Sequence, residues 1–170
     1  MALSIGRRLY NLTGRREAAE DASFPPRPAG RLIWLHAARP EAVQGLVQLA
    51  NKLADEDGVA TLLTGPRDGG HTPPPADQPA EVRAFLDHWH PDAIVLIRGG
   101  GAANDLAWLN DYHLARFICE QSIPVLTGIG HDIDRTIADE VAHAAYKTPT
   151  ACAGALIEAV RAYRDAVEAR

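Results

Sequence analysis

The sequence predicts an α/β fold in which a four-stranded parallel sheet lies between two layers of helices. Short apolar runs alternate with longer segments whose apolar residues recur at helical spacing, as in βαβ units. One run, Ala93 to Ile97, is apolar without a break, which indicates a strand buried on both faces. Right-handed crossovers then favour the strand order 2-1-3-4, counted along the chain. We therefore expect a three-layer sandwich of the Rossmann or flavodoxin-like kind.

The elements are predicted in order from apolar spacing and from helix start and stop signals. Four strands are expected at residues 31–36, 59–64, 93–97 and 123–127. Pro40 suits the first turn of the helix that follows the first strand and ends near Leu53. Further helices are expected over 79–89, from about 104 to 118, from about 134 to 145, and after Thr150 as an N-cap.

The first 30 residues are expected to stand apart from a single domain that spans residues 31–170. Residues 1–17 mix leucines with arginines and predict a short amphipathic helix that docks on the domain or, alternatively, lies on a membrane surface. Residues 21–30 contain three prolines and predict an extended linker. No stretch approaches the roughly 18 apolar residues of a membrane span, so no transmembrane segment is expected.

Charge and cysteine content narrow the classes of function. A formal charge of −5 and a pI near 5.8 count against a broad nucleic-acid-binding face, so that any phosphate binding should be local. Cys119 and Cys152 have neither metal-ligand nor disulfide-framework spacing, and we expect a cytoplasmic protein without a metal or a cofactor. A metal site formed by acidic residues around His131 is the weaker alternative. The oligomeric state, including a homo-oligomer, is left open.

The segment Arg98-Gly99-Gly100-Gly101 follows the third predicted strand and is the first candidate binding site. Glycines at a strand end let backbone N–H groups approach a ligand closely, and the next helix would direct its positive dipole end to the same place. With an arginine alongside, this arrangement favours an anion pocket. The alternative is a tight turn with an incidental arginine.

His131 and Asp134 follow the fourth predicted strand and could face the same pocket. The carboxyl ends of parallel strands share one edge of a sheet, which would also bring His36 there. A histidine beside a carboxylate can act as a general acid or base, and an arginine opposite can stabilise charge on a phosphate. This chemistry suits phosphodiester hydrolysis, whereas the structural alternative makes Asp134 a helix N-cap.

Residues from about Ile94 to Ala155, with the motifs RGGGAANDLAWLND, IPVLTGIGHDIDRTIADEVAH and KTPTACAGA, resemble the catalytic core of exonuclease VII large subunits. The resemblance implies Arg98, His131 and Asp134 as catalytic residues and degradation of single-stranded DNA. It also implies a small helical partner subunit. A further catalytic aspartate of that family would fall on Gly45, and the family's OB-fold domain and coiled-coil arm have no counterpart in this sequence.

The stretch before the glycines resembles a different family. Residues 1–97, notably GRLIWLHAARPEA and AEVRAFLDHWHPDAIVLI, are similar to the N-terminal Rossmann-like domain of Kdo transferases, which are glycosyltransferases. That resemblance implies Glu41 as a vestigial sugar-transfer base. Together, the two resemblances indicate a chimera of a Kdo-transferase-like half, residues 31–97, and an exonuclease-VII-like half, residues 98–170.

Three hypotheses of function follow from these resemblances. The first is an exonuclease VII large-subunit-like fragment that hydrolyses single-stranded DNA weakly or not at all, because its N-terminal half is replaced. The second is an engineered or recombined chimera without catalysis. The third is a glycosyltransferase domain fragment.

Overall fold

The computed structural model describes residues 9–10, 27–37, 40–64, 79–98, 109–129 and 135–169. Its centre is a parallel sheet in the order β1-β3-β2-β4-β5-β6. The four inner strands are β3 (Val59–Thr64), β2 (Arg31–Ala37), β4 (Ala93–Ile97) and β5 (Val125–Gly128). They confirm the predicted order 2-1-3-4. Two-residue strands, β1 (Leu9–Tyr10) and β6 (Ala144–Ala145), extend the edges.

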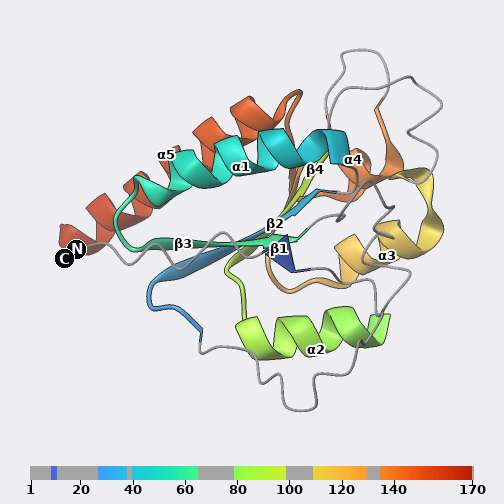
Figure 1. Cartoon of the computed structure of the whole chain (residues 1–170), viewed down its shortest axis with the longest axis horizontal. Helices are drawn as coiled ribbons and strands as arrows, with labels where there is room; N and C mark the ends of the chain where they lie inside the picture. The colour runs from blue at the N-terminus through green and yellow to red at the C-terminus, as the bar shows by residue number, and fades with distance from the viewer. Residues whose placement is uncertain are drawn as a thin grey trace.

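Helices cover both faces of this sheet, which confirms the three-layer prediction. The helices α1 (Pro40–Ala54) and α5 (Pro149–Glu168) lie together on one face (Figure 1). The helices α2 (Pro79–Trp89), α3 (Tyr112–Glu120) and α4 (Ile137–Val141) belong to the other face. Figure 1 shows α2 and α3 on the side of the sheet opposite α1.

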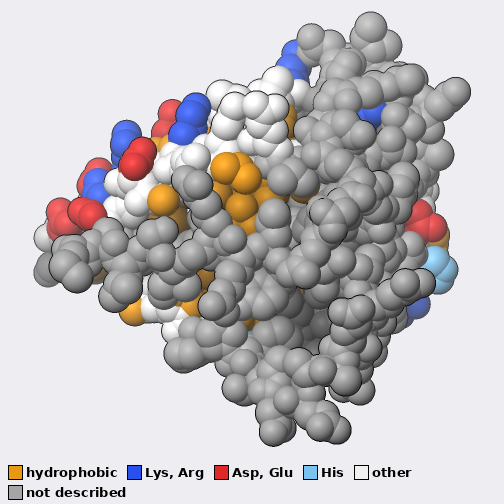
Figure 2. Space-filling model, viewed as in Figure 1, with side chains coloured by type: hydrophobic (Ala, Val, Ile, Leu, Met, Phe, Trp, Pro, Cys, Tyr) orange, Lys and Arg blue, Asp and Glu red, His pale blue; other side chains and the backbone are white. Residues whose placement is uncertain are grey.

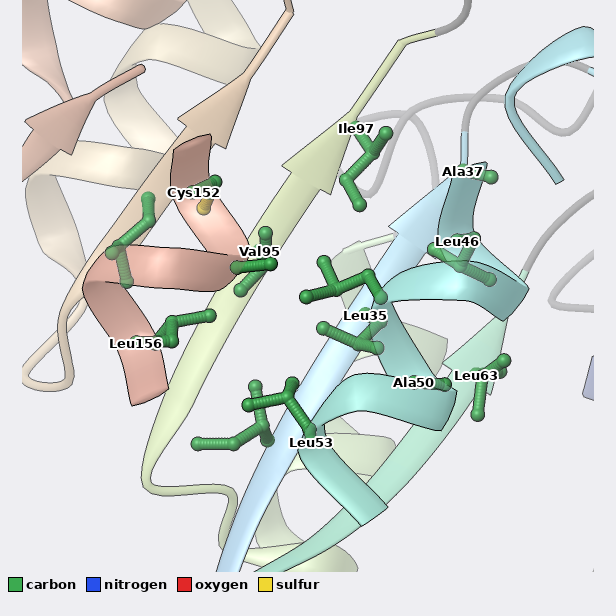
Figure 3. Packing of buried hydrophobic residues seen from close by; sticks show 14 of the residues in the cluster. Leu35, Ala37, Leu46, Ala50, Leu53, Leu63, Val95, Ile97, Cys152 and Leu156 are labelled. Carbon is green, nitrogen blue, oxygen red and sulfur yellow. The ribbon is translucent and has the colours of Figure 1, made fainter. Parts of the chain in front are cut away.

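Two apolar cores follow from the alternation of side chains along the strands. On the α1 and α5 face, Leu35 and Val95 pack with Leu46, Leu53 and Leu156 (Figure 3). On the other face, the next residues of the same strands pack against α2, α3 and α4. This second core includes Leu32, Trp34, Val82, Trp89, Ile94, Leu96, Leu109, Leu114 and Ile118. Trp34 and Trp89 are both almost completely buried in this core.

Two predictions about helices are wrong. Leu9–Tyr10 is a strand paired with β3, whereas a helix was predicted for residues 1–17, most of which lie outside the described residues. The helix predicted from about 134 to 145 is confined to α4, and Ala144–Ala145 form β6. The reason is that His143 N donates to Val125 O at 2.8 Å and Tyr146 N donates to Thr127 O at 2.9 Å, which draws this segment into the sheet.

The remaining correction concerns a helix start. The helix α5 begins at Pro149 with Thr148 as its N-cap, and not after Thr150, because Pro149 suits the first helical position. The helix α3 is capped by Asp111, which accepts from the backbone of His113 and Leu114. Of the two cysteines, Cys119 is exposed and Cys152 is buried.

Two sets of ionic contacts stabilise this fold, one around Asp92 and one between α5 and Glu56. At the amino edge of the sheet, the Asp92 carboxylate accepts from Arg27 at 2.9 Å, from Arg31 at 2.6 Å and from Leu32 N at 2.8 Å. Partial burial raises the Asp92 pKa, but these bonds outweigh it and lower the pKa overall. On α5, Arg161 forms a bidentate pair with Glu56 at 2.6 and 3.1 Å.

Two expectations from the sequence concerned a membrane-spanning segment and a broad basic face. Within the described residues, no helix has both the length and the apolar character needed to cross a bilayer. In Figure 2, positive and negative side chains are interspersed over the end of the molecule where α5 lies. The described part of this view therefore shows no broad basic face.

Candidate active site at the carboxyl edge of the sheet

The candidate site lies where the four inner strands end. In the parallel registers, Ile97 at the end of β4 pairs with Ala37 of β2 on one side and with Gly128 of β5 on the other. The chain segments that follow β4 and β5, which contain the predicted site residues, therefore leave the sheet side by side. This was the geometric condition on which the predicted site depended.

Arg98 follows β4 directly and is almost completely buried, with 3% of its surface exposed. Ile94 and Leu96, the alternate residues before it, belong to the core beneath α2 and α3. Strand alternation directs Arg98 to the same face. Its position at the ligand-binding edge of an α/β sheet favours a role in binding an anion.

Several predicted site residues lie outside the described residues. Gly99, Gly100, Gly101, His131 and Asp134 are among them. The backbone of Glu41 lies in the first turn of α1, but its side chain is not described. Their assigned roles stay predictions.

His36 lies at this edge, as predicted, near the end of β2. It pairs with Thr64 of β3 and with Leu96 of β4, and Leu96 pairs with Thr127 of β5. These residues form a transverse row across the sheet, at the last residue of β3 and one residue before the ends of β2, β4 and β5. Arg98 stands diagonally beyond His36 on the neighbouring strand.

His36 is buried, and its Nδ1 lies within hydrogen-bond distance of the Thr64 hydroxyl. Trp34 Nε1 donates to Thr64 Oγ1 at 2.9 Å, and the same oxygen lies 2.8 Å from His36 Nδ1. If the Thr64 hydroxyl donates to Nδ1, both of its bonds are used and the imidazole proton sits on Nε2. In either tautomer, Nε2 is buried without a hydrogen-bond partner among the described residues. Burial lowers the pKa of His36 to about 4, which keeps the ring neutral near pH 7.

A second polar cluster holds the N-terminal ends of α3 and α4 at the same edge, next to β5. Asp139 accepts from the Thr127 hydroxyl at 2.6 Å, and it forms a capping box with Thr136 at the start of α4. Asn110 Oδ1 accepts from Ile137 N at 2.8 Å. Asp139, considered at first as a weak metal ligand, is thus engaged by three protein donors. Among the described residues, no His, Cys, Asp and Glu group suited to a metal exists.

The start of α5 also belongs to this edge. A Cβ at Gly128 would lie 3.2 Å from Pro149 Cα, so the last residue of β5 packs tightly on the first turn of α5. A Cβ at Gly45, where the family resemblance implied an aspartate, would lie 3.9 Å from the Pro149 ring. The carboxyl edge therefore combines Arg98 with the N-terminal ends of α3, α4 and α5, whose dipoles favour anions.

The sequence analysis missed the polar cluster of Thr127, Thr136 and Asp139. The spacing of Thr136 and Asp139 is that of a capping box and was visible in the sequence. The bond from Thr127 to Asp139 depends on how α4 packs on β5, which local sequence does not reveal.

Comparisons with known proteins point to one family. The family model for the exonuclease VII large subunit matches residues 75–170, more than half of the chain. The exodeoxyribonuclease 7 large subunit of Deinococcus radiodurans is 51% identical over 69 residues, which are 41% of this chain and 17% of that protein. The Acaryochloris marina protein of the same description is 40% identical over 100 residues, 59% of this chain and 24% of that protein.

The chain spans less than a quarter of the length of these curated relatives. The matched region begins at residue 75, ahead of the junction that was predicted near residue 97, and it includes α2 and β4. The family model does not extend to residues 1–74, so the resemblance of the first half to Kdo transferases stays a prediction. On the strength of the match over residues 75–170, the chain belongs to the exonuclease VII large subunit family.

Proposed function

We propose that this chain hydrolyses phosphodiester bonds of single-stranded DNA, with low activity, at the carboxyl edge of its sheet. The observation that carries the proposal is the pairing of Ile97 with Gly128. It makes the segment after Arg98 and the segment around His131 leave the sheet from neighbouring strands, within the region that matches the family.

Each site residue has a separate role in this proposal. Arg98 binds the phosphate and stabilises the negative charge that develops on its oxygens. The backbone N–H groups of Gly99 to Gly101 hold the same phosphate. His131 acts as general base or acid, taking the proton of the attacking water or giving one to the leaving oxygen as the P–O bond breaks. Asp134 orients His131.

Low activity is expected because part of the family's machinery is replaced. Gly45 stands where the resemblance implies a further catalytic aspartate, and glycine offers no carboxylate. A net charge of −5 also weakens the attraction of the whole chain for DNA. We propose the exonuclease VII small subunit as a protein partner and the cytoplasm as the location.

Release of acid-soluble nucleotides from labelled single-stranded DNA tests the proposal. His131→Ala should abolish the release, whereas His143→Ala, which changes an exposed histidine just before β6, should leave it unchanged. Arg98→Lys keeps the positive charge, whereas Arg98→Gln removes it. If charge alone suffices, Arg98→Lys should retain more activity than Arg98→Gln. Release that His131→Ala leaves intact would refute the assigned mechanism, and its absence from every form would leave a folded chain without catalysis.

A further inference from the structure

Two exposed apolar side chains stand at the starts of neighbouring helices. Tyr112, the first residue of α3, is 68% exposed, and Ile137, the first residue of α4, is 45% exposed. Both are far more exposed than the apolar residues of the two cores. Exposure of large apolar groups next to a candidate site indicates binding rather than folding.

Hydrogen bonds place this pair at the carboxyl edge of the sheet. Asn110, two residues before Tyr112, accepts from the backbone N of Ile137 at 2.8 Å. Thr136 forms the α4 capping box with Asp139, and Asp139 accepts from Thr127, the residue before the end of β5. This chain of bonds fixes the starts of α3 and α4 beside β5, the strand that neighbours β4 and Arg98.

The surroundings of Tyr112 favour stacking over charge as its means of binding. The His113 ring meets the Tyr112 ring edge-on, with centroids 5.5 Å apart and an interplanar angle of 76°. The nearby arginines are already in ion pairs, Arg116 with Glu120 at 2.7 Å and Arg135 with Glu140 at 2.8 Å. An exposed tyrosine ring can stack on any base, because every base offers a flat π-face.

We propose that Tyr112, with Ile137 beside it, forms a stacking platform for a nucleobase of single-stranded DNA whose phosphate lies toward Arg98. This inference rests on the proposed function for its ligand, but it concerns binding and not cleavage. The platform supplies apolar contact to the base, whereas Arg98 supplies the charge. Its contribution to affinity should therefore be insensitive to salt.

Binding of fluorescent oligothymidylate to the full chain, measured by anisotropy over a range of salt concentrations, tests the platform. Tyr112→Ala should weaken binding by about 5- to 150-fold, the loss of one stacked base, without changing the slope of affinity against salt. Tyr112→Phe should bind as the unaltered chain does. Tyr163→Ala is the matched control, because Tyr163 is 54% exposed but packs over Arg31 at the amino edge.

The outcomes separate the platform from the proposed function. Weaker binding by Tyr112→Ala and unchanged binding by Tyr112→Phe and Tyr163→Ala would support the platform, even if no form of the protein cleaves DNA. Equal affinity of Tyr112→Ala and the unaltered chain, an equal loss in Tyr163→Ala, or no binding by the unaltered chain would overturn it. Cleavage without any effect at Tyr112 would leave the proposed function standing alone.

Discussion

The buried imidazole of His36 should make the fold sensitive to mild acid. In the folded chain, burial lowers the pKa of His36 from 6.5 to about 4. An unfolded chain therefore binds a proton at His36 more readily than the folded chain does. Stability from this group is full above pH 6.5, is lost as the pH falls toward 4, and changes no further below that.

The size of the effect follows from the two pKa values. At about 1.4 kcal/mol for each pH unit that separates them, protonation of His36 costs about 3 kcal/mol of unfolding free energy in total. Roughly 2 kcal/mol of this loss should occur between pH 7 and pH 5, before carboxylates titrate. For a domain of this size, such a loss is a large part of the total stability.

Urea unfolding at a series of pH values between 7.5 and 5 measures this loss. His36→Asn offers an amide oxygen near the place of Nδ1 to the Thr64 hydroxyl and cannot be protonated, so its stability should fall by about 2 kcal/mol less over this range. His113→Asn removes an exposed histidine and should keep the steep dependence of the unaltered chain. Parallel curves for the unaltered chain and His36→Asn would refute the argument.

Replacement by alanine should change the free energy of unfolding in opposite directions at two glycines, Gly154 in α5 and Gly128 at the end of β5. Gly154→Ala should raise the unfolding free energy by about 0.5–1 kcal/mol, because this exposed position inside α5 has nothing within 4 Å of an added Cβ, and thermal unfolding would show the rise. Gly128→Ala should lower it by about 1–3 kcal/mol, since its Cβ would press on the Pro149 backbone, and a gain on urea unfolding would contradict the tight packing of β5 on α5.

The elements that could be predicted from sequence are those whose signal is local. The run Ala93 to Ile97 and the helix Pro79–Trp89 have the predicted bounds, because apolar pattern and proline position agree there. Ala144–Ala145 could not be assigned in this way, since alanine suits a helix and only pairing with β5 decides for a strand. Pro149, by contrast, carried a helix-start signal that should have set the start of α5.

The candidate site was predictable in its position but not in its chemistry. Strand order placed Arg98 and His36 at one edge. The neutral state of His36 follows from its burial, and its hydrogen bond to Thr64 depends on the register between β2 and β3. Tyr112 gave no sequence signal, because the pattern does not tell an exposed aromatic residue from a buried one.

The helix α5 is attached to the domain by buried residues in its first half and by an ion pair farther along. Its first turn packs tightly on Gly128, and farther along Arg161 forms an ion pair with Glu56 in the turn after α1. A helix of 20 residues is about 30 Å long and stiff over that length. The stretch of α5 beyond Arg161 is mostly exposed and therefore extends from the domain as a stiff projection.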